Sequence, residues 1–146
     1  MPRARAWTDD DGSASLEFLT VGVLLLVPIA YLVIALGAIQ NASLGVEASA
    51  RFVARSIAGG QDAPPDAVLA SVADAYGLDP DALEVRVTCL PEGPECPTAG
   101  STVSVTVADR VPLPLVPGFL GLGERLAVPV DATAVFRASR LAETSP

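Results

Sequence analysis

Hydrophobic residues gather in one long stretch near the start of the chain. The 22 residues from Phe18 to Ile39 are mainly Leu, Val, Ile and Ala, and no Asp, Glu, Lys, Arg or His lies between Glu17 and Glu47. A helix rises about 1.5 Å per residue, so this stretch spans roughly 33 Å, enough for the hydrocarbon core of a bilayer. The pattern predicts one transmembrane helix, preceded by a short polar segment.

Beyond the apolar stretch, polar and apolar residues are interleaved with helical spacing. Glu47 and Arg51 stand four residues apart, in the order that favours a side-chain pair on a helix. The pattern ends at Gly59-Gly60, a signal that terminates helices and begins loops. We expect one helix over residues 13–58, about 68 Å long. Pro28 would remove one backbone hydrogen bond and kink this helix without ending it.

A second, shorter helix is predicted over residues 66–76, with Asp66 as its N-cap and Gly77 as its stop signal. Its apolar residues recur at helical spacing and should face a core. They are Val68, Leu69, Val72 and Tyr76.

From Leu83 the apolar period changes to two, which is typical of half-buried strands. Alternation over 83–89 and 103–107 predicts a β-hairpin with a long connection, and residues 126–137 form a third candidate strand. Pro129 indicates that this third strand lies at a sheet edge or begins late. The predicted fold class is α+β and pilin-like: a long N-terminal transmembrane helix, then a small domain in which helices cover one face of a three-stranded antiparallel sheet.

These elements divide the chain into a cytoplasmic leader (1–12), the long helix (13–58) and an outer α+β domain (59–146). Residues 138–146 should fray at the end of that domain. Residues 111–123 are apolar but rich in Pro and Gly. They would cap the sheet, form a contact patch for another subunit, or dip towards the membrane surface.

The chain has two cysteines, Cys89 and Cys96, in the region that joins the first two predicted strands. Two thiols without any histidine make a poor zinc site, so a disulfide is the economical interpretation, with two reduced thiols as the alternative. Basic residues are nearly balanced on the two sides of the apolar stretch, but a disulfide requires an oxidising compartment. We therefore expect a single-pass cell-membrane protein with a cytoplasmic N-terminus and an extracytoplasmic outer domain.

Composition narrows the function classes. With 17 acidic and 9 basic residues, the chain has a net charge of −8, which argues against nucleic-acid binding. The sequence contains no His and no Lys, and it shows no nucleophile beside a base. We expect no catalytic residue, no metal site and no cofactor.

Glu17 is the exception to the apolar pattern, because it stands where the long stretch begins. An acidic group inside a membrane is disfavoured by up to about 3 kcal/mol at the centre, so a pairing partner is expected. Gly12 lies five residues before Glu17, and Phe18 follows it directly. The segment Gly-Ser-Ala-Ser-Leu-Glu-Phe-Leu-Thr, residues 12–20, resembles the processing site of type IV prepilins, and in particular the TadE-like family of tight-adherence pilus assembly proteins.

The resemblance implies cleavage after Gly12 by a membrane-embedded prepilin peptidase, which leaves Ser13 as the first residue. Glu17, followed by Phe18, would then serve assembly by neutralising the free amine of a neighbouring subunit or by recruiting that subunit. Opposite charges that are desolvated together are tolerated where either alone is not.

The expected function is therefore that of a minor pseudopilin-like subunit for the assembly of tight-adherence pili. Its expected partners are membrane lipid, the peptidase and other pilin-like subunits. The alternative is an uncleaved single-span anchor that displays an extracytoplasmic binding domain. A cleaved secretory signal is disfavoured, because the apolar stretch is longer than the usual 7 to 15 residues.

Overall fold

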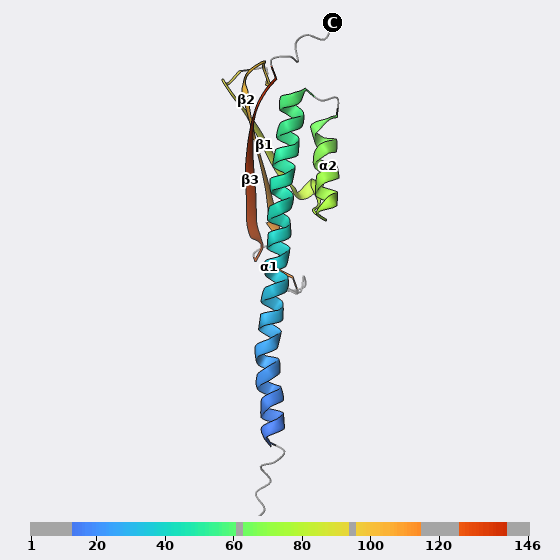
Figure 1. The fold of residues 1–146 in the computed structure, drawn as a ribbon, viewed down its shortest axis with the longest axis vertical. Helices are drawn as coiled ribbons and strands as arrows, with labels where there is room; N and C mark the ends of the chain where they lie inside the picture. The colour runs from blue at the N-terminus through green and yellow to red at the C-terminus, as the bar shows by residue number, and fades with distance from the viewer. Residues whose placement is uncertain (1–12, 61–62, 94–95, 115–125, 140–146) are drawn as a thin grey trace, which may run out of the picture.

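The computed structural model of the chain describes residues 13–60, 63–93, 96–114 and 126–139. Figure 1 shows one long helix whose upper half is packed against a sheet and a short helix, while its lower half stands clear of both. The predicted leader (1–12), most of the apolar loop 111–123 and the end of the tail lie outside the described residues.

The long helix α1 (Ser13–Gly59) is continuous over 47 residues, one residue longer than predicted, and it includes Pro28. From Ser15 to Ile34 every residue except Tyr31 is exposed. The upper half buries a row of small residues that continues to the helix end, listed here: Ala42, Val46, Ser49, Ala50, Val53, Ala54 and Ala58. The lower half of α1 is therefore exposed, and one face of its upper half is buried in the domain core.

The sheet contains β1 (Glu84–Leu90), β2 (Thr102–Val111) and β3 (Val128–Arg137) in the order β1-β2-β3, with both pairs antiparallel. The three-stranded antiparallel sheet is thus confirmed. β3 lies at an edge, as its proline indicates, and it begins at Val128 rather than Leu126. The centre of the core is formed by Val103, Val105 and Val107 of β2, which are fully buried.

The cover of the sheet differs from the prediction, because only α1 packs on the strands. In Figure 1 the sheet, α1 and the short helix α2 (Pro65–Ala75) follow one another from left to right, and α2 packs on α1. A helix about 10 Å wide covers roughly two strands spaced 4.8 Å apart, and α1 covers β2 and β3. Val85 and Val87 of β1 face the same side but remain 40% and 41% exposed.

The start of α2 also differs from the prediction. Pro64 is the N-cap residue and makes no side-chain cap, Pro65 is the first helical residue, and Asp66 lies inside the first turn. Proline fits this position because its missing N–H would have had no partner in the helix. A short 3₁₀ helix, η1 (Pro80–Ala82), follows and had no counterpart in the sequence analysis.

The chain remains attached beyond β3, where fraying was predicted. The Ala138 N–H donates to the Ser101 carbonyl at 2.7 Å, and the Ser139 N–H donates to the Ala58 carbonyl at 3.0 Å. These bonds tie the end of the sheet to the end of α1. The prediction that fraying starts at Ala138 was therefore wrong.

Candidate assembly site at the start of the long helix

The first residues of α1 coincide with the predicted processing site. Gly12 and the bond that would be cleaved lie outside the described residues, whereas Ser13 is the first residue of the helix. A chain that began at Ser13 would therefore begin at the helix start. Its free amine would lie four residues, about one turn, before Glu17.

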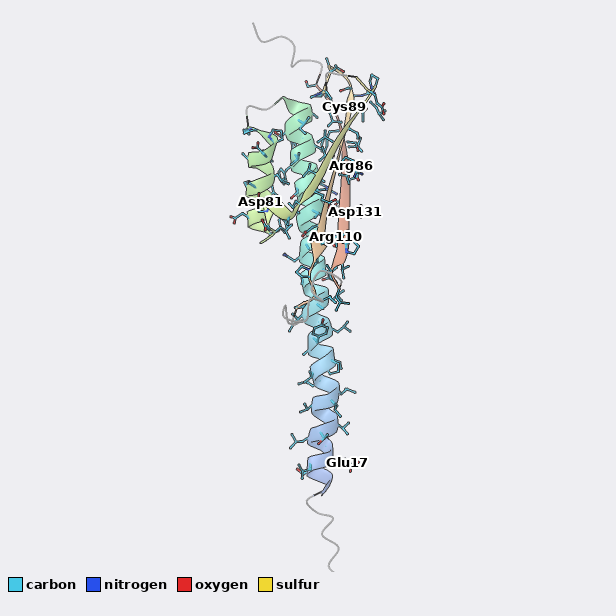
Figure 2. All side chains as sticks on the ribbon, turned by 180° about the vertical axis from the view of Figure 1, so that it is seen from behind. Glu17, Asp81, Arg86, Cys89, Arg110 and Asp131 are labelled. Carbon is cyan, nitrogen blue, oxygen red and sulfur yellow. A yellow bond between two sulfur atoms is a disulfide. The ribbon has the colours of Figure 1, made fainter. Side chains whose placement is uncertain are left out.

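Glu17 and Phe18 lie on the bare half of α1. Glu17 is exposed, and Phe18 is 81% exposed. Figure 2 shows Glu17 near the lower end of the helix, far from the other labelled residues on the outer domain. Within the described residues, Arg51 forms an ion pair with Glu47, whereas Glu17 forms none.

Thr20 carries the nearest polar side chain on the following turn, and its hydroxyl already makes a hydrogen bond. Its Oγ1 donates to the Leu16 carbonyl at 2.7 Å. Serine and threonine hydroxyls commonly satisfy themselves in this way on helices in apolar surroundings. The carboxylate of Glu17 is therefore free to accept hydrogen bonds from a cation outside the described chain.

The helix that carries Glu17 has the length and composition of a membrane span. Over Ser15–Gly59 its most apolar window has a mean hydropathy of 2.7, with 6% of that window buried. The exposed part from Ser15 to Ile34 is about 30 Å long, close to the thickness of a hydrocarbon core. A helix of this kind near the N-terminus could cross a membrane.

A compact junction joins the bare half of α1 to the outer domain. The Asn41 side-chain amide donates to the Tyr76 carbonyl at 2.8 Å. One turn later, a Cβ added at Gly45 would lie 2.5 Å from Leu78 Cδ1 and 3.0 Å from Tyr76 Cβ. The chain after α2 thus touches α1 where only glycine leaves room.

The sequence analysis did not single out this junction. Its one available signal was a glycine inside a helical pattern, which often marks a close approach. Such a signal does not identify the segment that approaches, because Tyr76 and Leu78 are distant in sequence.

Cys89 and Cys96 are joined by a disulfide with a Cα–Cα distance of 6.0 Å. Cys89 is buried on the inner face of β1, directly opposite Val103. The bond ties the end of β1 to the connection that leads into β2. Figure 2 places Cys89 at the end of the molecule opposite Glu17, so the two sites that the sequence indicated are separate.

Within the described ranges, no three His, Cys, Asp or Glu residues form a group that could hold a metal ion. Comparisons with protein-family models, with curated proteins and with solved structures found no match to the chain.

Proposed function

We propose that this chain is a pilin-like membrane subunit for the assembly of tight-adherence pili, matured by a prepilin peptidase that cuts after Gly12. The observation that carries the proposal is the division of α1. Its lower half is bare, apolar and marked by one unpaired carboxylate, while its upper half is the core helix of a small domain.

The bare half requires an apolar environment. Large side chains such as Leu24 and Leu26 are exposed along it, and a stretch of this length in water would expose far more contiguous apolar surface than a soluble monomer tolerates. Lipid tails or the helices of neighbouring subunits satisfy this need equally well. The same helix can therefore serve first as an anchor and then as a packing element.

Glu17 would form a specific ion pair between packed helices. A carboxylate near the start of an apolar helix is stabilised by a cation that shares its environment. Cleavage after Gly12 creates such a cation, the amine of Ser13, in every copy. A neighbour's amine beside Glu17 would neutralise both charges, so processing and assembly would be linked.

The outer domain fits the extracytoplasmic side. It is attached to the upper half of α1 alone, so a membrane can surround the lower half without disturbing the sheet. Its disulfide is of the kind that persists in oxidising compartments. The proposed topology is a cytoplasmic leader, one span and an extracytoplasmic domain.

The test is the mass and N-terminal sequence of the membrane-extracted protein, from cells with and without their prepilin peptidase. We expect a chain that starts at Ser13 only when the peptidase is present. The Gly12→Val variant, produced in the same cells, should keep its leader. A chain that retains Met1 or Pro2 in both strains would instead identify an uncleaved anchor with a displayed domain.

A further inference from the structure

The sheet has two free edges that run in the same direction. β2 is antiparallel to both neighbours, so β1 and β3 are parallel to each other. Within the described residues, neither edge is paired with a further strand. Unpaired strand edges are ready templates for pairing with another chain.

The backbone hydrogen bonds fix which residues of each edge point outwards. The Ala138 N–H donates to the Ser101 carbonyl and the Ala138 carbonyl accepts from the Gly100 N–H, so the backbone groups of Ala138 point towards the β2 side. Bonded and non-bonded pairs alternate along an antiparallel ladder, so the Pro129–Arg110 pair is non-bonded, as a proline requires. The backbone groups of Asp131, Thr133 and Val135 therefore point away from β2.

The same alternation continues across β2 to the other edge. A residue of β2 whose backbone bonds to β3 does not also bond to β1. The residues of β2 that bond to β1 are therefore the ones opposite Glu84, Arg86 and Thr88. On β1 it is therefore Val85, Val87 and Cys89 whose backbone groups point outwards.

These orientations favour one geometry between the two edges. In a parallel ladder, a residue bonds to the two residues that flank its neighbour on the partner strand. Thr133 placed beside Thr88 of another copy would bond to Val87 and Cys89, which both point outwards. A parallel arrangement thus keeps the open faces of both sheets, away from α1, on the same side. An antiparallel arrangement of these two edges would turn one sheet over.

The side chains on the open face select the same direction and a register. β1 carries Arg86 and, four residues later, Leu90; β3 carries Asp131 and, four residues later, Val135. Leu90 is 65% exposed and Val135 is 59% exposed. In a parallel pairing with Thr133 beside Thr88, Asp131 meets Arg86 and Val135 meets Leu90. Reversing one strand would place each charge beside an apolar side chain.

On the inner face, this register places apolar residues beside the poorly covered side of β1. Val130 comes beside Val85, Ala132 beside Val87, and Ala134 beside Cys89. This contact would bury part of the valines that α1 leaves half-exposed. Pro129 has no N–H to donate, so the pairing begins after it.

We propose that copies of this chain associate through their sheets, with β3 of one copy pairing in parallel with β1 of the next. The inference rests on the proposed function in one respect, because it takes the copies to be anchored upright in the same membrane. Upright copies can present β3 to β1 only in parallel. Pairing β1 with β1, or β3 with β3, between upright copies would turn one sheet over and place the two open faces on opposite sides.

The pairing is head-to-tail and staggered. Within one copy Arg86 is level with Thr133, whereas in the proposed contact Arg86 of the next copy is level with Asp131. Each copy is therefore displaced by two residues, about 7 Å along the strands. A head-to-tail contact leaves a free edge at each end, so it can extend to further copies. Figure 2 shows Arg86 and Asp131 in the sheet region of the outer domain.

The test uses two differently tagged full-length chains, one with Thr88→Cys and one with Thr133→Cys, co-expressed and oxidised in isolated membranes. We expect a disulfide-linked heterodimer of the two tags. The matched control replaces Thr88→Cys by Ser104→Cys, which lies opposite Thr88 on the same face but in the central strand. A central strand cannot reach the neighbour, so this control should not cross-link.

A second experiment tests the charge register in the same cross-linking format. Arg86→Asp in the Thr88→Cys chain should lower the dimer fraction about two- to fivefold, as expected for an exposed ion pair. Asp131→Arg in the other chain should restore it. Arg110→Asp, a charge reversal on the central strand, should leave the dimer fraction unchanged.

The outcomes separate the pairing from the proposed function. Membrane-inserted, Ser13-initiated chains that cross-link no better than the Ser104→Cys control would overturn the pairing and leave the proposed function standing. Thr88→Cys homodimers in place of the heterodimer would also overturn it. Chains that are absent from the membrane fraction would overturn both.

Discussion

At the scale of single residues, Glu17 stands on the exposed apolar half of α1 and forms no ion pair within the described residues. Glu17→Gln keeps the size of the side chain and removes its charge. On the proposed function, we expect processing at Gly12 to continue and the fraction of self-associated subunits to fall about tenfold, because the proposed pair between Glu17 and a neighbour's amine would be lost. Cross-linking of intact membranes measures that fraction.

Glu47→Gln is the matched control for that experiment. It makes the same chemical change one helix half away, where Glu47 forms an exposed pair with Arg51. Such a pair contributes only about 0.3–0.5 kcal/mol. Equal effects of the two substitutions would contradict an assembly role for Glu17.

Gly45 is a residue at which the structure restricts the side chain. Gly45→Leu should destabilise the outer domain by about 1–3 kcal/mol, because the space beside it is filled by Leu78 and Tyr76. Gly37→Leu should not, since nothing lies within 4 Å of a Cβ there and leucine is the better helix former. The urea midpoint of the circular dichroism signal in detergent distinguishes the two variants.

At the scale of elements, apolar periodicity predicted each helix longer than one turn and each strand of the described structure. The predicted starts of these helices and strands lie within two residues of the observed starts. Two predictions were wrong. Pro64 rather than Asp66 is the N-cap of α2, and α1 alone covers a sheet that the helices were expected to cover. Periodicity shows that a face is apolar, but not which element covers it.

The hairpin between β1 and β2 depends on its disulfide. Cys89→Ala with Cys96→Ala should lower the stability of the outer domain by about 2.5 kcal/mol on the chain-entropy model. The reason is that the unfolded chain gains conformational entropy once this short loop is no longer closed by the disulfide. A lower urea midpoint in the double variant measures the loss. Adding a reductant should shift the native protein to the same midpoint and leave the double variant unchanged; a midpoint insensitive to both would contradict the prediction.

At the scale of the whole molecule, the sequence indicated the candidate site but not the edge contacts. Glu17 stands out because it is a charged residue where a long apolar run begins, a signal that is local in sequence. Arg86 and Asp131 are ordinary charges on polar strand faces, and their relation follows only once β1 and β3 are known to be parallel edges. Strand order and register are long-range properties, so no local pattern could supply them.

The last prediction follows from the division of α1 into an exposed lower half and an upper half with one buried face. A fragment of residues 36–146 keeps the upper half of the helix and should fold as a soluble domain with cooperative unfolding. A fragment of residues 60–146 keeps α2 and the three strands but loses Val46, Val53 and the other α1 residues of the core. It should fail to fold, because three buried valines of β2 would face water.

The physical reason is the small size of the core. Exposing a buried valine costs roughly 1.5 kcal/mol or more, so the three valines of β2 together cost about 4.5 kcal/mol or more. That loss is a large share of the roughly 5–15 kcal/mol by which ordinary domains are stable. Circular dichroism and urea unfolding of both fragments provide the measurement. A shorter fragment that unfolds as cooperatively as the longer one would show that α1 is only a tether. Failure of the longer fragment would show that the domain needs the exposed lower half of α1 as well.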